Sequence, residues 1–182
     1  MVNINYISIM KRFFVVILLI IGMCIAQAQE IATPEEVRAG EMDIHLVAQL
    51  CGHNYDGEFY PLTGIGIYLG YSHFFKEQHR LSGGVELAYR NGGGQVLFIP
   101  DYHYEWLKNT FRFAVGMQLM VGYCHGFGFA TGLQPNVEFG IFLTEGLSLK
   151  LGIGYRVMGY PTTTHQVGNF LGEMPITIGI TF

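Results

Sequence analysis

Charged residues are scarce in this chain of 182 residues: Asp, Glu, Lys and Arg together make up 13% of it, while hydrophobic residues make up 50%. Basic residues number 10 against 14 acidic ones, so the formal net charge is −4. Without a basic excess the chain lacks the electrostatic footprint of a nucleic-acid binder, and we expect no nucleic-acid partner. The length is enough for one domain.

A helical periodicity is missing as well. After residue 42 no segment repeats its apolar residues every three or four positions, as an amphipathic helix would. Glycine is abundant at 25 residues, and 11 tyrosines accompany 14 phenylalanines. This mixture argues against a helical enzyme and favours an all-β protein with tight turns and aromatic surfaces.

One long apolar run lies near the N-terminus. Two basic residues precede FFVVILLIIGMCIA, and Ala-Gln-Ala follows at residues 26–28. This is the anatomy of a secretory signal peptide, so we predict that residues 1–28 are removed after Ala28. An uncleaved anchor helix and a lipoprotein signal at Cys24 are the alternatives, although the run is shorter than the roughly 20 residues that a membrane span needs. Translation from Met10 instead of Met1 fits the same interpretation.

The rest of the chain divides into two parts. Residues 29–42 are polar and acidic, and we predict a short lead segment there. From residue 43 to residue 182, apolar residues alternate with polar or small ones, which is the period of a β-strand. Eight segments show this alternation, at residues 43–51, 64–74, 80–90, 95–106, 110–123, 133–143, 147–157 and 173–182. Strands of about ten residues cross a bilayer at a tilt, and eight is the smallest usual number for a transmembrane barrel.

The non-apolar face of these segments distinguishes a soluble sandwich from a membrane barrel. A sandwich would bury its apolar face and present Lys, Glu and Thr to water. Here the other face is largely Gly, Ser and Gln with a few charges of both signs, which suits a narrow lumen. The apolar face is wide and bordered by aromatic residues, as a lipid-facing surface is. These are Tyr89, Tyr102, Tyr104, Trp106, Phe111, Tyr123 and Tyr155.

We therefore predict an all-β fold, an eight-stranded antiparallel up-and-down transmembrane β-barrel that occupies residues 43–182. We expect it in the bacterial outer membrane, in contact with outer-membrane lipid and monomeric. A soluble periplasmic sandwich or a lipocalin-like binder is the alternative, and it would bury the apolar face instead. Charges on the inner face are expected to pair and to fill the lumen, Glu86 and Glu138 with Arg112, Lys150 and Arg156.

Connection lengths predict which end of the barrel faces outward. Short turns are expected around KEQH, LKN and TEG, and longer outer connections at residues 52–63, 124–132 and 158–172. Only NGGG at residues 91–94 is short where a long connection is expected. The segment 159–173 is the longest outer loop in this interpretation. It is the best candidate for contact with a partner, because exposed loops carry function on rigid scaffolds.

The signal peptide, the alternating segments and the terminal ITIGITF resemble small outer-membrane barrels of the OmpX or OmpA-transmembrane type. By this resemblance, Phe182 corresponds to the C-terminal aromatic that the barrel-assembly machinery reads, so the machinery is an expected partner. More narrowly, IGIYLGYSHFF, FLTEGLSLKLGIGYRVMG and IGITF resemble the conjugative-transposon TraO family of Bacteroidetes over residues 64–182. AQAQ after the signal is common in that phylum. The TraO resemblance contains no catalytic motif and implies an accessory role in conjugative transfer.

Catalytic chemistry finds little support in the sequence. Some eight-stranded barrels modify lipid A, and the deacylase kind resembles a His-x-Ser pair on one strand face. Here Ser72 and His73 are adjacent and point to opposite faces, and neither Ser82 nor Ser148 has a histidine two residues away. A palmitoyl-transferase arrangement would need a serine near His53 and Asp56, which lie in the first outer connection, and none stands out.

Two cysteines follow the predicted signal peptide, Cys51 and Cys124, in a compartment that would be oxidising. Cys51 ends the first predicted strand and Cys124 directly follows the fifth, on opposite sides of the barrel. A disulfide needs Cα atoms within about 7 Å, so their loops would have to fold inward. A disulfide, a metal site with His53 and His125, and unlinked cysteines are the three alternatives. We predict no metal and no cofactor.

The sequence thus predicts a protein that is not an enzyme and that has a structural or surface-interaction role through its outer loops. An accessory role in conjugative transfer is the first alternative, and a lipid-A-modifying enzyme is the second.

Overall fold

The computed structural model describes residues 40–53, 59–76, 78–90, 93–108, 110–125, 128–160 and 169–182. The predicted signal peptide, residues 1–28, and most of the lead segment, residues 29–42, lie outside the described residues, so these predictions are not tested. Within the described part of the chain, no helix is long and apolar enough to span a membrane.

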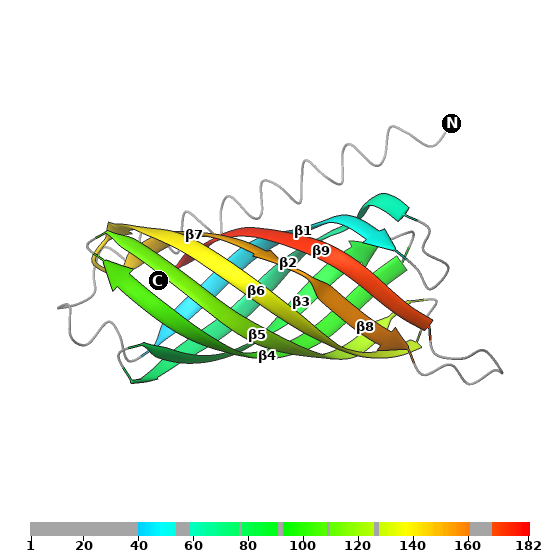
Figure 1. Ribbon diagram of the computed structural model, residues 1–182, viewed down its shortest axis with the longest axis horizontal. Helices are drawn as coiled ribbons and strands as arrows, with labels where there is room; N and C mark the ends of the chain where they lie inside the picture. Colours follow the sequence, from blue (N-terminus) through cyan, green and yellow to red (C-terminus); the bar gives the residue numbers. More distant parts are fainter. Residues whose placement is uncertain are drawn as a thin grey trace.

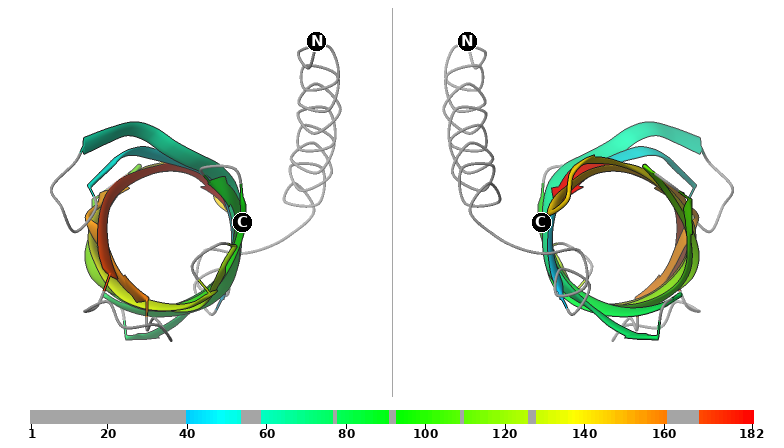
Figure 2. Two further views of the ribbon diagram at one scale, coloured as in Figure 1. Left: turned by 90° about the vertical axis from the view of Figure 1, so that its right-hand side faces the viewer. Right: turned by 90° about the vertical axis from the view of Figure 1, so that its left-hand side faces the viewer.

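The described residues form one closed antiparallel β-sheet (Figures 1 and 2). Its strands are β1 Glu41–His53, β2 Phe59–Lys76, β3 His79–Arg90, β4 Gly93–Lys108, β5 Phe111–Cys124, β6 Gly128–Thr144, β7 Leu147–Gly154, β8 Arg156–Tyr160 and β9 Asn169–Thr181. Each strand from β1 to β6 pairs with the next, and β9 pairs with β1 to close the barrel. Both β7 and β8 lie between β6 and β9, so they share one of eight strand positions.

Two prolines explain why one strand position contains two strands. Strand β6 pairs with β7 and with β8 in the same register. Asn136 lies opposite Gly154 and Leu133 lies opposite Val157, so Tyr155 lies opposite Pro135. The Tyr155 N–H donates to the Pro135 carbonyl at 3.0 Å, but Pro135 has no N–H to return. On the other side the same register places Gly154 opposite Pro175 of β9. The ladder is therefore interrupted on both sides while the strand direction continues.

The two ends of the barrel differ in their connections. The turn end carries the connections at residues 77–78, 109–110 and 145–146, together with the start of β1 and the C-terminus. The loop end carries the connections at residues 54–58, 91–92, 125–127 and 161–168. The predicted longer connection at residues 124–132 is wrong, because only 125–127 separate β5 from β6. Within residues 128–132, Phe129 is exposed and Ala130 is buried, so outward and inward positions still alternate. The glycines of this segment obscure that alternation in the sequence.

The apolar face of the strands points outward, as the alternation predicts. Ile65, Leu87, Phe98, Leu119 and Leu151 are each about half exposed, whereas the residues between them are mostly buried in the interior. Aromatic side chains make a row of ring contacts near the turn end, where the Tyr104 and Trp106 centroids lie 4.7 Å apart. The soluble alternative required a buried apolar face and is therefore wrong for this chain.

Glycines on the inner face make room for rings on neighbouring strands. A Cβ added at Gly84 of β3 would meet the ring of Tyr68 on β2, and one added at Gly116 of β5 would meet the ring of His103 on β4. A barrel of eight strands is just wide enough for its side chains to fill. Large inner residues therefore lie against glycines, which accounts for the glycine-rich face.

Candidate functional site

The interior near the turn end contains a chain of alternating acidic and basic side chains, which we name the interior charge network. Its members are Glu41 and Asp43 of β1, Arg80 of β3, Glu105 of β4, Arg112 of β5, Glu138 of β6 and Lys150 of β7, all of them buried. They reach the interior because each occupies the inward register of its strand. The network joins six strands across the lumen.

Two arginines and one lysine link the carboxylates of this network. Arg80 pairs with Glu138 and, at 3.1 Å, with Glu105. Arg112 pairs with the same Glu105 at 2.9 Å and with Glu41 at 3.0 Å. Every buried charge in this series therefore has an opposite charge beside it, which offsets the cost of removing it from water.

Asp43 is the most connected carboxylate of the network. It accepts hydrogen bonds from Lys150 Nζ at 2.7 Å, from Thr181 Oγ1 at 2.6 Å and from Ser72 Oγ at 2.5 Å. His45 Nε2 lies 3.5 Å from the same carboxylate. Because Asp43 joins β1 to β7, β9 and β2, it ties together the strands around the closure of the barrel.

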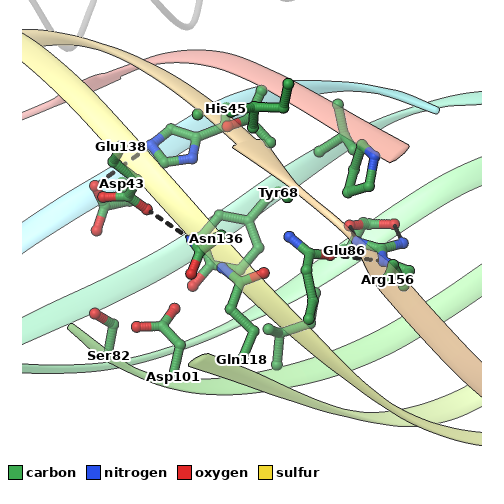
Figure 3. Close-up of a pocket in the computed structure, with 18 of the residues that line it drawn as sticks. Asp43, His45, Tyr68, Ser82, Glu86, Asp101, Gln118, Asn136, Glu138 and Arg156 are labelled. Carbon is green, nitrogen blue, oxygen red and sulfur yellow. Dashed lines mark hydrogen bonds and ion pairs between the residues drawn. The ribbon is translucent and has the colours of Figure 1, made fainter. Parts of the chain in front are cut away.

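A group of polar side chains around His103 lies next to the interior charge network. His103 Nδ1 is 3.1 Å from Asp101 Oδ1, and His103 Nε2 is 3.3 Å from Glu138 Oε1 and 2.8 Å from Asn136 Nδ2. A cavity of about 20 Å³ is lined by Asp101, Asn136 and Glu138 among others, and also by Tyr68 (Figure 3). Such a volume accommodates about one water molecule, so the centre of the lumen is filled by side chains.

A separate ion pair lies further toward the loop end. Arg156 of β8 binds Glu86 of β3 through two bonds, Nη1–Oε1 at 2.8 Å and Nη2–Oε2 at 2.6 Å (Figure 3). Its Nε donates to Gln134 Oε1 at 2.8 Å, and Gln95 Nε2 donates to Glu86 Oε1 at 3.2 Å. This two-pronged geometry is the strong form of a carboxylate–guanidinium pair.

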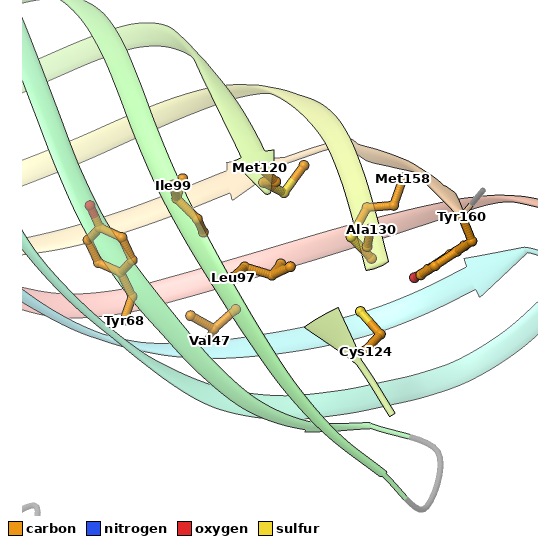
Figure 4. Packing of buried hydrophobic residues seen from close by; sticks show 9 residues of the cluster. All are labelled: Val47, Tyr68, Leu97, Ile99, Met120, Cys124, Ala130, Met158 and Tyr160. Carbon is orange, nitrogen blue, oxygen red and sulfur yellow. The ribbon is translucent and has the colours of Figure 1, made fainter. Parts of the chain in front are cut away.

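Buried apolar side chains fill the interior from its middle to the loop end, and we name them the apolar plug (Figure 4). They are Val47, Tyr68, Leu97, Ile99, Met120, Cys124, Ala130, Met158 and Tyr160. This cluster was not predicted, because the inner face of the strands was expected to be small and polar with a few charges. The available signal was position, since Leu97 and Ile99 occupy the inward register that alternates with exposed Val96 and Phe98.

All five residues predicted to form the lumen charge cluster lie in the interior: Glu86, Arg112, Glu138, Lys150 and Arg156. Only Glu86 and Arg156 pair with each other among the five. The others pair with residues that were not singled out: Glu138 with Arg80, Lys150 with Asp43, and Arg112 with Glu41 and Glu105. Their predicted structural role is not tested by their position alone.

The cysteine and metal alternatives receive only partial answers. Cys124 is buried in the interior, with its Sγ 3.5 Å from Gln95 Oε1. The side chains of Cys51 and His53 lie outside the described ones, so the disulfide with Cys124 stays a prediction. Among the described residues, no group of three or more His, Cys, Asp or Glu side chains is arranged to hold a metal ion.

Phe182 lies where the barrel closes. Its N–H donates to the Met42 carbonyl at 3.0 Å, and the Met42 N–H donates to the Phe182 carbonyl at 2.7 Å. The last residue of the chain is therefore paired with the beginning of β1. Its recognition by the assembly machinery stays a prediction.

Comparisons with known proteins agree with this architecture. No protein-family model matches the chain, and no curated protein matches it either. The structure is similar to that of neisserial surface protein A, with a TM-score of 0.55 and 12% identity over 79% of this chain and 97% of that one. OprG of Pseudomonas aeruginosa is also matched, with a TM-score of 0.48 and 10% identity over 79% and 95% of the two chains. The attachment invasion locus protein Ail of Yersinia pestis is matched with a TM-score of 0.44 and 13% identity, over 79% and 99%.

At these identities the likeness concerns the fold, and it confirms the predicted closed eight-stranded antiparallel barrel of the small outer-membrane type. The outward face of the barrel is apolar and about half exposed, as the outward face of a transmembrane barrel is. The fold and this face together assign the chain to the bacterial outer membrane. The narrower resemblance to the TraO family is not shown by these comparisons and stays a prediction.

Proposed function

We propose that this protein is a non-conducting outer-membrane β-barrel that is not an enzyme, and that its rigid body presents the loop-end connections for a structural or surface-interaction role. The observation that carries the proposal is the filled lumen. The interior charge network occupies it near the turn end, and the Glu86–Arg156 pair and the apolar plug occupy it toward the loop end. A body closed in this way supports a role at its loop-end connections rather than in transport.

The buried hydroxyls support the proposal that the barrel is not an enzyme. Ser72 donates to Asp43, and Asp43 also lies beside His45, so the carboxylate stands between the serine and the histidine. In this order the histidine is not placed to take the serine proton. Ser72 is also fully buried, and no substrate could reach it without opening the barrel. Incubation with lipopolysaccharide in detergent is expected to release no fatty acid.

Conductance measurements test the filled lumen directly. The folded protein is added to a planar lipid bilayer, with an established porin as the positive control. We expect no discrete current steps from the wild-type barrel, because the cavity described at the centre of its lumen accommodates only about one water molecule. Reproducible ohmic steps at the same protein concentration would show an open passage and refute the proposal.

Surface presentation needs a second experiment on intact cells. An epitope inserted within the connection 161–168 is expected to bind antibody without permeabilisation, whereas the same epitope at the 145–146 turn is expected to bind only after permeabilisation. The two sites lie at opposite ends of the barrel, so they form a matched pair. The reverse pattern would place the loop end in the periplasm.

The accessory role in conjugative transfer is supported only by the sequence resemblance over residues 64–182. If it holds, deletion of the gene in a donor that carries a conjugative element should lower the transfer frequency, and the intact gene should restore it. An unchanged transfer frequency would leave the surface-interaction role as the better proposal.

A further inference from the structure

A depression in the outer wall crosses three strands near the loop end. Its outward-facing lining consists of Leu119 and Val121 of β5, Thr131 and Leu133 of β6, and Val157 and Gly159 of β8. The depression has a volume of about 410 Å³. Thr131 supplies the single side-chain hydroxyl among these residues, so the lining is almost wholly apolar.

The strand register explains why the wall is hollowed there. Val121 pairs with Thr131, and Thr131 pairs with Gly159, so side chains become smaller across one outward row. The neighbouring row toward the turn end is Leu119, Leu133 and Val157. The next outward row toward the loop end pairs Tyr123 with Phe129, and both of these side chains are more than half exposed. A row of small side chains between two rows of large ones leaves a depression.

The surroundings of the depression determine its occupant. It is continuous with the exposed apolar face that contacts the bilayer, and unfilled space against such a wall would forfeit dispersion contacts. A flexible hydrocarbon chain can enter between the two rows of large side chains. A second barrel could not enter the depression, because its convex wall would first touch the large side chains on either side, at Leu133 and Phe129.

We propose that this depression is a lipid-binding site that holds one acyl chain of a membrane lipid, with the headgroup at the level of Tyr123 and Phe129. Aromatic side chains occupy the membrane–water interface, so this row lies at the depth of lipid headgroups. A chain that descends from a headgroup at this level passes directly over Thr131 and Gly159. The inference rests on the barrel standing in a bilayer and not on the proposed role of the loops.

Native mass spectrometry of the full barrel in mild detergent tests the site, with a saturated-chain phosphatidylethanolamine as the probe. T131W fills the depression, and G83W is the matched control. Gly83 lies on the outward face of β3, and a Cβ added there meets nothing within 4 Å. We expect the wild type and G83W to retain one lipid, and T131W to retain it roughly tenfold less. Loss of about ten carbon–carbon dispersion contacts between the acyl chain and the wall produces a change of that size.

Any of three results would overturn the proposal. One is equal lipid retention by the wild type and both variants, when a heat-dependent gel shift shows that all three are folded. Another is equal retention of glycerophosphoethanolamine, which has no acyl chain and would indicate a headgroup site. The third is a wild-type dimer that T131W converts to a monomer, which would identify a second copy of the chain as the occupant. None of these results depends on whether the lumen conducts.

Discussion

Arg156 and Glu86 form the ion pair whose energetics are easiest to isolate, because Arg156 meets Glu86 through two short bonds. Replacing Arg156 with methionine leaves the buried Glu86 carboxylate without its cation. We expect R156M to lower the free energy of unfolding by about 3–5 kcal/mol, the usual cost of an uncompensated buried charge. Urea titration of the barrel folded in lipid vesicles measures this change.

A double variant separates the value of the pair from the cost of breaking it. E86Q/R156M removes both charges, so it should recover a substantial part of the stability that R156M loses. E145Q is the control, because Glu145 is exposed in the β6–β7 turn, and its effect should stay within about 0.5 kcal/mol. If the double variant is no more stable than R156M, the unpaired charge is not the cause of the loss.

At the residue scale, the sequence indicated which charged side chains face inward but not which ones meet. Arg80 and Glu105 lie on the inward register of strands that were predicted, so their burial could be anticipated. Their contacts could not, because Arg80 of β3 reaches Glu138 of β6 across the lumen. Such a contact depends on the stagger of strands that are not neighbours, and alternation within one strand contains no information about it.

Among the strands, the break between β7 and β8 tests how prolines shape the wall. Replacing Pro135 with valine (P135V) restores an N–H opposite the Tyr155 carbonyl, since Tyr155 already donates to the carbonyl of residue 135. We expect the new backbone amide at position 135 to be protected from hydrogen exchange in NMR spectra of the labelled barrel. The free energy of unfolding should change little. A new hydrogen bond contributes about 0.5–1.5 kcal/mol, and loss of the proline constraint costs about 0.4–1 kcal/mol.

Rapid exchange of this new amide in P135V, at the rate of an amide in an exposed turn, would contradict this account. It would show that something other than the missing donor separates β7 from β8. P100V in β4 is a useful companion variant. The β4–β5 ladder is likewise interrupted between Phe98–Val121 and Asp101–Gln118, with no change of register.

The sequence predicted the number of strand positions better than the strand ends. Tyr155 and Val157 keep the outward parity of Ile153, so β7 and β8 were correctly expected as one segment. At the loop end the strands extend further than the alternation indicated, and β2 begins at Phe59 rather than at residue 64. Glycine and proline obscure the period there, whereas hydrogen bonds to the neighbouring strands continue.

For the whole molecule, the assignment of the apolar face to lipid is the prediction with the widest consequences. The outward direction of this face is confirmed, because one face of every strand is apolar over the full circumference and a closed barrel of eight strands has too little interior for so many large side chains. Its contact with lipid stays a prediction. The apolar plug could not be anticipated in the same way. Leucine and methionine on the inner face resemble lipid-facing residues until the neighbouring strands assign them a side.

Arginine substitutions at two depths test this assignment in the whole barrel. Val137 and Leu143 lie on the outward face of the same strand, β6, with Val137 near its middle and Leu143 next to the turn. If a bilayer surrounds the barrel, V137R should lower the free energy of unfolding in vesicles by about 2–4 kcal/mol, and L143R by about 0–1 kcal/mol. Around a barrel in water, both substitutions would fall within about 0.5 kcal/mol. The heat-dependent gel shift measures the folded fraction of each variant across a urea series. Equal and small effects at the two depths would mean that the apolar face does not meet lipid, because only a bilayer makes the cost of a charge depend on its depth.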